Sequence, residues 1–207
     1  MRVTMDGQTI TDQAEGVAQA IEMVRERAES LGRLVIEVIA DGQPAPDLLD
    51  AMPADPAGVR ELGVTTAKKS LFLRETLAQA RETLERTRAD QAHAAGRIDA
   101  GEIAEALGSL RAIIEGWQLV RAVVDQAAAL SGLVCDDLRS GDEPGGVVVR
   151  ALADDLVALR DAVSREDWSG LSDNLACDLD ARAVQWIGLI DALAARTTGP
   201  DDGATTA

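Results

Sequence analysis

The sequence is poor in aromatic residues and contains no tyrosine. Phe72, Trp117, Trp168 and Trp186 are its complete aromatic set in 207 residues. A core made from such a chain is aliphatic and alanine-rich, so its helices approach one another through small residues while the tryptophans fill the larger spaces. A chain of this length buries about 70 % of its unfolded surface and folds without the help of a disulfide or a metal.

Cysteine and histidine are scarce as well, which limits the chemistry that the chain supports. Cys135 and Cys177 form no C-x-x-C pair, so the sequence predicts neither a disulfide framework nor a zinc site, and we expect two reduced core thiols. His93, the single histidine, forms a candidate acid/base pair with Asp90, but no nucleophile in a glycine-flanked turn accompanies it. The phosphate-binding patterns G-x-x-x-x-G-K and G-x-G-x-x-G are absent too. We therefore expect no enzyme and no cofactor.

Long apolar runs are missing and positive charge is sparse. The longest apolar stretch, residues 34–40, is interrupted by Glu37, and the first ten residues hold no apolar secretion segment, so we expect a cytoplasmic protein that does not enter a membrane. Lys68 and Lys69 are the only lysines among 20 basic residues, and the arginines are scattered among acids. A net charge of −16 repels phosphate backbones, so we expect no nucleic-acid partner.

Residues 1–40 predict a small ββαβ module. MRVTM alternates as a strand does, and Asp6-Gly7 is a dipeptide that type I′ hairpin turns favour. Residues 12–15 resemble a capping box in front of an amphipathic helix that Gly32 ends. A strand follows, with Leu34, Ile36 and Val38 on its apolar face.

Residues 41–66 predict a linker, because Pro44, Pro46, Pro53, Pro56 and three glycines leave no room for a long regular element. Short helical turns around 47–52 and 57–62 are compatible with this composition. The domain boundary is therefore expected here.

Residues 67–196 predict an antiparallel four-helix bundle, and residues 197–207 predict a disordered tail. Gly96 is expected to end the first helix and Asp99 to cap the second, whose apolar stripe is the longest and has Trp117 at its middle. Ser164 or Asp167 is expected to open the last helix. The fold class is thus mainly α, and α+β overall.

Acidic pairs at i, i+3 are the strongest hint of catalysis. Such pairs hold Mg²⁺ in the all-α nucleotide pyrophosphatases, whose E-x-x-E motif is joined by an E-x-x-D motif on a neighbouring helix. The chain has no such E-x-x-D partner, and its acids alternate with arginines, so surface ion pairs explain them better. The E-x-x-E pairs are Glu26 and Glu29, Glu82 and Glu85, and Glu102 and Glu105.

Three residues near the last helix are candidates for binding a protein partner. Trp117 and Trp186 lie on apolar stripes and are assigned to the core, whereas Trp168, in a first helical turn, is either a hydrophobic staple or an exposed anchor. Asp173 and Asp178 belong to an acidic cluster on the last helix, and Asp178 is either a buried or groove-facing acid or part of a solvated flank.

The resulting hypothesis is a non-enzymatic interaction protein, namely an adaptor, a chaperone-like protein or an assembly subunit. Flagellar and type III export chaperones are also small, acidic and helical, but no motif of theirs is matched residue by residue. The alternative is a Mg²⁺-dependent hydrolase of the nucleotide pyrophosphatase kind. Because a sheet of three strands leaves unpaired edges, we also expect a homodimer.

Overall fold

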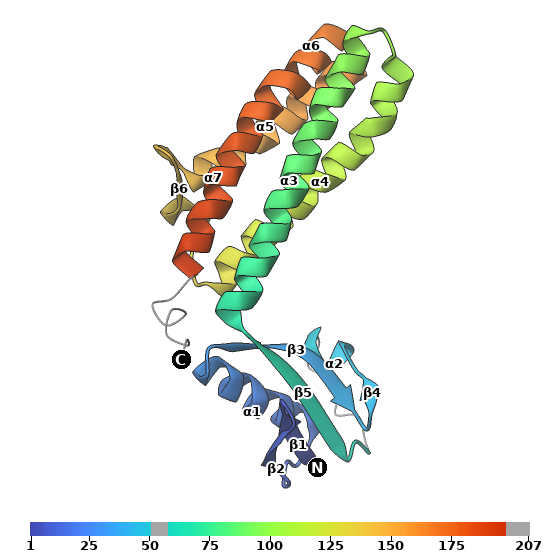
Figure 1. Cartoon of the computed structure of the whole chain (residues 1–207). Helices are drawn as coiled ribbons and strands as arrows, with labels where there is room; N and C mark the ends of the chain where they lie inside the picture. The colour runs from blue at the N-terminus through green and yellow to red at the C-terminus, as the bar shows by residue number, and fades with distance from the viewer. Residues whose placement is uncertain (51–57, 198–207) are drawn as a thin grey trace, which may run out of the picture. The chain divides into compact units, whose positions relative to one another are not determined.

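The computed structural model describes residues 1–50 and 58–197, and the chain divides into two compact units, Met1–Phe72 and Leu73–Ala207 (Figure 1). We call them the N-terminal unit and the helical unit. The chain is mainly helical and α+β overall, as the sequence predicts. Within the described residues, no helix combines the length and the hydrophobicity that crossing a bilayer needs.

The N-terminal unit is a five-stranded mixed sheet that packs one face against helix α1 (Val17–Ser30) (Figure 1). The strand order is β2-β1-β5-β3-β4, in which β1 and β5 are parallel and the other neighbours antiparallel. The short helix α2 (Asp47–Asp50) follows β4. The strands are β1 (Arg2–Met5), β2 (Gln8–Thr11), β3 (Arg33–Ala40), β4 (Gln43–Pro44) and β5 (Glu61–Lys68).

The predicted hairpin and helix are present, but the helix begins differently from expectation. Asp6 and Gly7 both have positive φ, at 51° and 78°, as a type I′ turn requires. Gly16 is the N-cap of α1 and no side chain caps it, so the capping box expected at residues 12–15 is wrong. The Glu15 backbone N–H donates to the Gln19 side-chain oxygen instead. Gly32, at φ 63°, ends the turn after α1 as predicted.

Strand β5 corrects the expectation of an irregular linker over residues 41–66. It lies between β1 and β3, and its residues Leu62, Val64 and Thr66 are buried against the α1 side. The strand is compatible with the prolines, because β5 begins after the last of them. Its residues alternate between buried and less buried positions, as a strand requires. The helical turn expected around residues 57–62 is therefore wrong for Glu61 and Leu62, which begin β5. Helix α2 agrees with the turn expected around residues 47–52. Pro53, Pro56 and the predicted tail beyond Thr197 lie outside the described residues.

A β-bulge in β3 changes which of its residues face the core. The register with β5 shifts between Val35 and Glu37, so Ile36 has no cross-strand partner and is 47 % exposed. Val35 packs against the core before the bulge, and Val38 and Ala40 do so after it. The expected apolar face of Leu34, Ile36 and Val38 is therefore wrong, because a single extra residue inverts the alternation.

A polar cluster ties the hairpin turn to the sheet. The Thr66 backbone N–H and hydroxyl both donate to the Asp6 carboxylate, at 2.8 and 2.7 Å. Arg33 lies 3.3 Å from the same carboxylate and also donates to Thr66. The hydrogen bond from the Thr66 hydroxyl, followed by that from its backbone N–H, lowers the pKa of Asp6, although burial opposes the shift.

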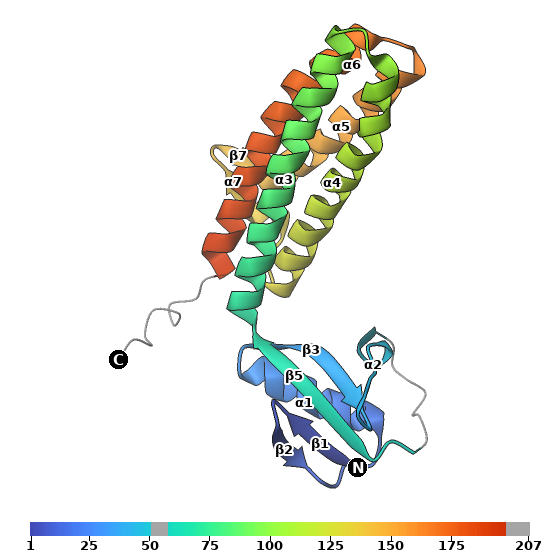
Figure 2. The same ribbon diagram turned by 45° about the vertical axis from the view of Figure 1, so that its right-hand side comes forward.

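In its described residues the helical unit has four long helices and three short helical segments around one core (Figure 2). Short elements, η1 (Cys135–Asp137), β6 (Arg139–Ser140) and β7 (Glu143–Pro144), join the second long helix to the third. The helices are α3 (Lys69–Asp99), α4 (Ile103–Leu130), α5 (Gly145–Ser164), α6 (Trp168–Asp173), the π-helical turn η2 (Asn174–Asp178) and α7 (Leu179–Thr197).

Two helix boundaries differ from the expected ones. Helix α3 continues through Gly96 to Asp99, and the turn that follows uses Gly101 at φ 84°. Asp99 does not cap α4, whose N-cap is Glu102 without a side-chain bond; Asp99 instead accepts a hydrogen bond from the Ser172 hydroxyl at 2.8 Å. A single glycine costs a helix about 1 kcal/mol, which packing over a long helix outweighs. Asp167 does cap α6, by accepting from the Gly170 N–H at 3.0 Å.

The core of the helical unit is aliphatic, with two large aromatic side chains at its centre. Trp117 and Trp186 are fully buried, as the apolar stripes predict, and meet edge-to-face with ring centroids 6.0 Å apart. Gln91 on α3 is fully buried in the same unit. Neither end of its amide, nor the indole N–H of either tryptophan, has a hydrogen-bond partner among the described residues.

Ion pairs connect α7 to its neighbours. Arg81 on α3 contacts Asp191 at 2.6 Å. Arg88, about two turns further along the same face of α3, contacts Asp180, and this hydrogen bond lowers the pKa of Asp180. Arg182 contacts Asp155 of α5 at 2.7 Å, with both side chains less than a fifth exposed. The π-helical turn lies just before α7, and there Asn174 is buried and donates to the Asp155 carbonyl.

The Asp6 cluster generates a pH-dependent prediction. Because the pKa of Asp6 is lowered in the folded state, its stabilisation is present above the unfolded pKa and is lost as pH falls through the folded pKa. Asp6→Asn keeps a residue that tolerates positive φ but removes the charge. We expect it to lower the stability of the N-terminal unit by about 1–2 kcal/mol at pH 7, with a smaller difference at acid pH.

Amide hydrogen exchange in β1 and β5 is the appropriate measurement, because all three tryptophans lie in the helical unit and report only on it. Asp12→Asn is the matched control, since the Asp12 side chain is 72 % exposed and its carboxylate lies 3.8 Å from the Arg2 guanidinium. Equal losses of protection in the two variants would contradict the role of the cluster.

The enclosed amide generates a second prediction. Burying an unpaired amide costs about 1–3 kcal/mol, so Gln91→Met, which keeps the length of the side chain, should raise the free energy of unfolding by about 1–2 kcal/mol. Urea denaturation followed by tryptophan fluorescence measures this change in the helical unit. Gln118→Met, at an exposed position of α4, should change it by less than about 0.5 kcal/mol. A lower free energy of unfolding for Gln91→Met would show that the Gln91 amide is hydrogen-bonded in solution.

Candidate functional site

The three predicted partner-binding residues differ in their surroundings. Trp168 is half-buried and packs against the core of the helical unit, whereas Asp173 and Asp178 are exposed. Trp168 and Asp173 are five residues apart on α6, which is far from a whole number of helical turns, so they point to different sides. The structure thus places Asp173 and Asp178 on a solvated flank, and Trp168 at the edge of the core.

The candidate catalytic residues lie on exposed helix surfaces. All six acids of the E-x-x-E pairs are exposed, and Glu85 is paired with Arg81 at 3.3 Å. His93 and Asp90 are exposed on α3. Among the residues that the structure describes, no group of three His, Cys, Asp or Glu side chains is placed to share a metal ion.

The cysteines differ in their surroundings. Burial raises the pKa of the half-buried Cys135 thiol, as expected for an inert core cysteine. Cys177 is exposed, so its assignment to the core is wrong. It lies in η2 between Leu175 and Leu179, the first residue of α7; both leucines are fully buried, whereas Cys177 faces solvent.

An apolar hollow of about 420 Å³ lies between α4 and α5. Its charged and polar groups are few: Arg160, which is held by Asp161 at 2.7 Å, and Ser164. No acidic side chain lines it among the described residues, although the chain carries 36 acids against 20 basic residues. We call it the α4–α5 groove, and it is lined by Leu110, Ile114, Leu156, Leu159, Arg160, Val163 and Ser164.

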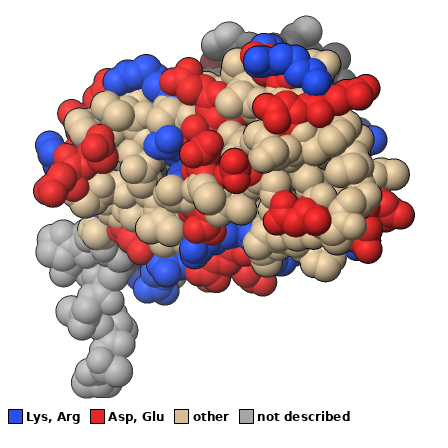
Figure 3. Space-filling view, turned by 90° about the horizontal axis from the view of Figure 1, so that it is seen from above, with Lys and Arg blue, Asp and Glu red and all other residues tan. Residues whose placement is uncertain are grey.

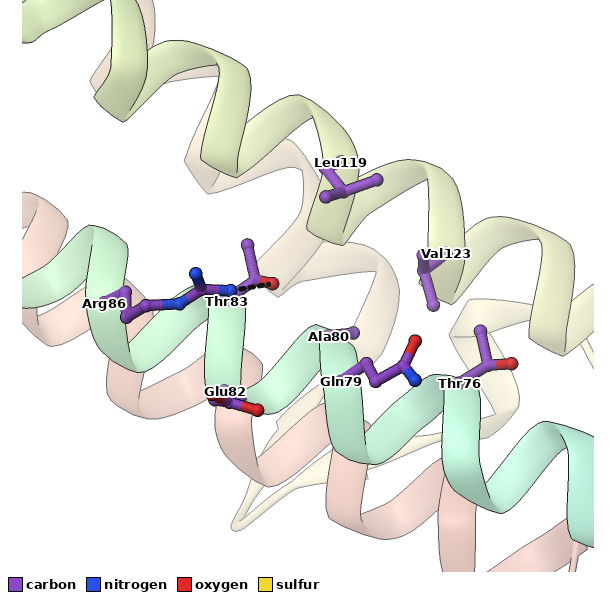
Figure 4. Close-up of a pocket in the computed structure, with 8 residues that line it drawn as sticks. All are labelled: Thr76, Gln79, Ala80, Glu82, Thr83, Arg86, Leu119 and Val123. Atoms are coloured by element: carbon purple, nitrogen blue, oxygen red, sulfur yellow. Dashed lines mark hydrogen bonds between the residues drawn. The ribbon is translucent and has the colours of Figure 1, made fainter.

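A second hollow, of about 260 Å³, lies between α3 and α4 (Figure 4). Its α3 side is polar and carries Arg86, which donates to the Thr83 hydroxyl at 3.2 Å. Its α4 side is apolar, and Leu119 there is 53 % exposed. We call it the α3–α4 groove, and it is lined by Thr76, Gln79, Ala80, Glu82, Thr83, Arg86, Leu119 and Val123.

A close contact holds α3 against α4 next to the second groove. A Cβ atom added to Gly116 would lie 2.2 Å from the Thr87 Oγ1 and 3.3 Å from the Thr87 Cβ, so only glycine fits there. One turn along α3, the residues that face α4 are short, namely Thr83 and Ala80. They do not fill the space beside Leu119, and the α3–α4 groove results (Figure 4).

Sequence reasoning missed both grooves, although a signal was present. The apolar positions of α4 exceed those that its core stripe needs, because Leu119 and Val123 lie on one flank of the buried stripe and Ile114 lies on the other. Such a widened stripe shows that a helix has apolar surface beyond its core contacts. It does not show which neighbour leaves that surface open.

On the face seen in Figure 3, acidic and basic side chains are interspersed. No family model, no curated protein and no solved structure matches the chain. The two grooves are therefore the features of the helical unit from which a function is inferred.

The Thr87–Gly116 contact generates a prediction with a control on the same helix. Gly116→Ala gains helix propensity but forces Thr87 aside, so we expect the free energy of unfolding to fall by about 1–2 kcal/mol. Gly108→Ala, where the added Cβ meets nothing within 4 Å, should raise it by about 0.5–1 kcal/mol. Urea denaturation measures both.

Combining Gly116→Ala with Thr87→Ala tests the cause, because it removes the clashing hydroxyl. The double variant should have a higher free energy of unfolding than Gly116→Ala. Thr87→Ala should therefore be more favourable in the Gly116→Ala background than in the native chain. If Gly116→Ala and Gly108→Ala stabilise the protein equally, the close approach does not exist in solution.

Proposed function

We propose that this chain is a non-enzymatic protein-interaction module, acting as an adaptor, a chaperone-like protein or an assembly subunit. Its helical unit is proposed to be an antiparallel four-helix bundle of α3, α4, α5 and α7. The α4–α5 groove is proposed to receive the apolar face of a helix from the partner. Trp168, Asp173 and Asp178 stay as proposed peripheral contacts.

The observation that carries this proposal is the α4–α5 groove itself. Its lining is aliphatic apart from Arg160 and Ser164, and it lies between two helices of a chain with a net charge of −16. A hydrophobic hollow on a strongly charged soluble surface is typical of a binding site. Because few polar groups are present to orient a small molecule, a partner side chain suits the groove better.

The geometry favours a helix as the partner element. An amphipathic helix places side chains at i, i+3 and i+4 into a groove between two helices. Burying one aliphatic anchor gives about 1.5–3 kcal/mol, so two anchors give about 3–6 kcal/mol. Micromolar affinity corresponds to about 8 kcal/mol, so the partner needs further contacts outside this groove.

Self-association and cytoplasmic residence also stay proposals. The sheet has five strands among the described residues, and the edge strand β4 is short, with two residues that include Pro44. Strand β2, with four residues, is the longer free edge and the proposed site of pairing with a second copy.

The Mg²⁺-dependent hydrolase is the second candidate, and the exposed acid pairs give it no specific support. A thermal-shift measurement with Mg²⁺ and nucleoside triphosphates separates the two functions, because a ligand of the native state raises its melting temperature. We expect no shift. A shift that requires both metal and nucleotide would favour the hydrolase over the interaction module.

Site-specific crosslinking tests the α4–α5 groove. A photoreactive benzoylphenylalanine at Ser164, which is exposed and lines the groove, should crosslink to a defined protein in cells of the native host. The same group at Ala122, exposed on α4 and outside both grooves, is the matched control and should not. Identical crosslinks from both positions would contradict binding in the groove.

The captured protein then allows the affinity to be measured. Ile114→Ala combined with Leu156→Ala should weaken its binding by about 10-fold to 100-fold, since both side chains are half-buried groove residues. Val157→Ala, which removes an exposed aliphatic side chain of α5 outside the lining, should leave the affinity nearly unchanged. Circular-dichroism melts confirm that each variant is folded.

A further inference from the structure

The α3–α4 groove has two unlike walls, and this limits what fits it. Leu119 and Val123 on α4 form an apolar wall, while α3 presents hydroxyl, amide and guanidinium groups (Figure 4). Its volume of about 260 Å³ is below the roughly 300–1,000 Å³ of small-molecule sites. The groove therefore suits one or two anchoring side chains of a larger partner.

Arg86 is the charged group that is available in this groove. Its neighbours on α3, Arg81 and Arg88, are occupied by Asp191 and Asp180. Within the described residues, no carboxylate lies within ion-pair distance of Arg86, and its hydrogen bond to Thr83 uses one of five N–H donors. Glu82 also lines the groove, but its carboxylate is drawn on the side of α3 away from α4 (Figure 4).

We propose that the α3–α4 groove binds a segment of a partner protein that places an Asp or Glu side chain on Arg86 and an aliphatic side chain against Leu119 and Val123. The proposal rests on the proposed interaction function and adds the chemistry of the partner. A guanidinium recognises a carboxylate through two parallel hydrogen bonds, and the aliphatic wall supplies apolar burial next to it.

The net charge of the chain restricts the partner further. At −16 the chain repels a highly acidic segment over about 10 Å, so the bound segment carries its single carboxylate among neutral or basic residues. The same repulsion disfavours a second copy of this chain as the occupant. In this arrangement Arg86 binds the one carboxylate of the segment, and the neutral or basic residues around that carboxylate are not repelled by the acidic surface of the chain.

Selection from a phage-displayed library of random dodecapeptides, with the full chain as the target, supplies the probe. We expect Asp or Glu at a fixed spacing from Leu, Ile, Val or Met in the selected peptides. In fluorescence anisotropy, Arg86→Gln should weaken a selected peptide at least tenfold, Arg86→Lys less, and Leu119→Ser by a similar amount to Arg86→Gln. Arg74→Gln, at an exposed α3 position outside the groove, is the control and should change nothing.

A double-mutant cycle identifies the contact. Replacing the acid of the peptide by its amide should weaken binding to the native chain about tenfold and should not weaken binding to Arg86→Gln any further. Peptides that depend on Ile114 and Leu156 but not on Arg86 would overturn this inference and leave the proposed function standing. A selection without any Arg86-dependent peptide overturns it as well, and the crosslinking from Ser164 then decides the α4–α5 groove separately.

Discussion

The contact between Thr87 of α3 and Gly116 of α4 is the constraint on which the helical unit depends. This contact lets two long helices approach closely in a core that has few large side chains. The residue after Gly116 is Trp117, which packs against Trp186 of α7. Where α3 continues with Ala80 and Thr83, its side chains are too short to fill the space beside α4. Close packing at one level of a helix pair therefore leaves a groove at the next, and the aliphatic composition of the chain makes both possible.

The sequence predicts the helices of this protein better than its sheet, and the reason is the range of the interactions. A helix shows its core stripe within a few turns, so the stripe around Trp117 is readable, and the Asp6-Gly7 turn is readable from two residues. Strand β5 is not readable in the same way, because its place depends on partners about 60 residues earlier in β1 and on the bond from Thr66 to Asp6. The bulge at Ile36 likewise depends on the register with β5, and it reverses the side of the sheet that the following residues of β3 face.

The candidate site depends even more on tertiary structure. The apolar stripe of α4 indicates that Trp117 is buried. Leu119 and Ile114 are also apolar, but whether a neighbouring helix covers them is decided by helix packing. For this reason the sequence candidates Trp168, Asp173 and Asp178 differ in their surroundings, since Trp168 packs against the core and both aspartates are exposed. Arg86 was indistinguishable from the other arginines, because only the fold shows that Arg81 and Arg88 are occupied by acids of α7.

The two grooves lie on opposite flanks of the apolar stripe of α4 and have complementary physical characters. The α4–α5 groove offers aliphatic burial, which gives affinity but discriminates weakly among apolar side chains. The α3–α4 groove carries Arg86, which has no ion-pair partner among the described residues, beside an aliphatic wall; in the proposed complex it would add little affinity but would disfavour a segment without a carboxylate at that position. Specificity is a difference of affinities, and in a chain of net charge −16 a contact to one arginine would produce such a difference against a repulsive background. A helix with an apolar groove on one flank and a charged one on the other is thus suited to recognise one partner among many that are merely hydrophobic.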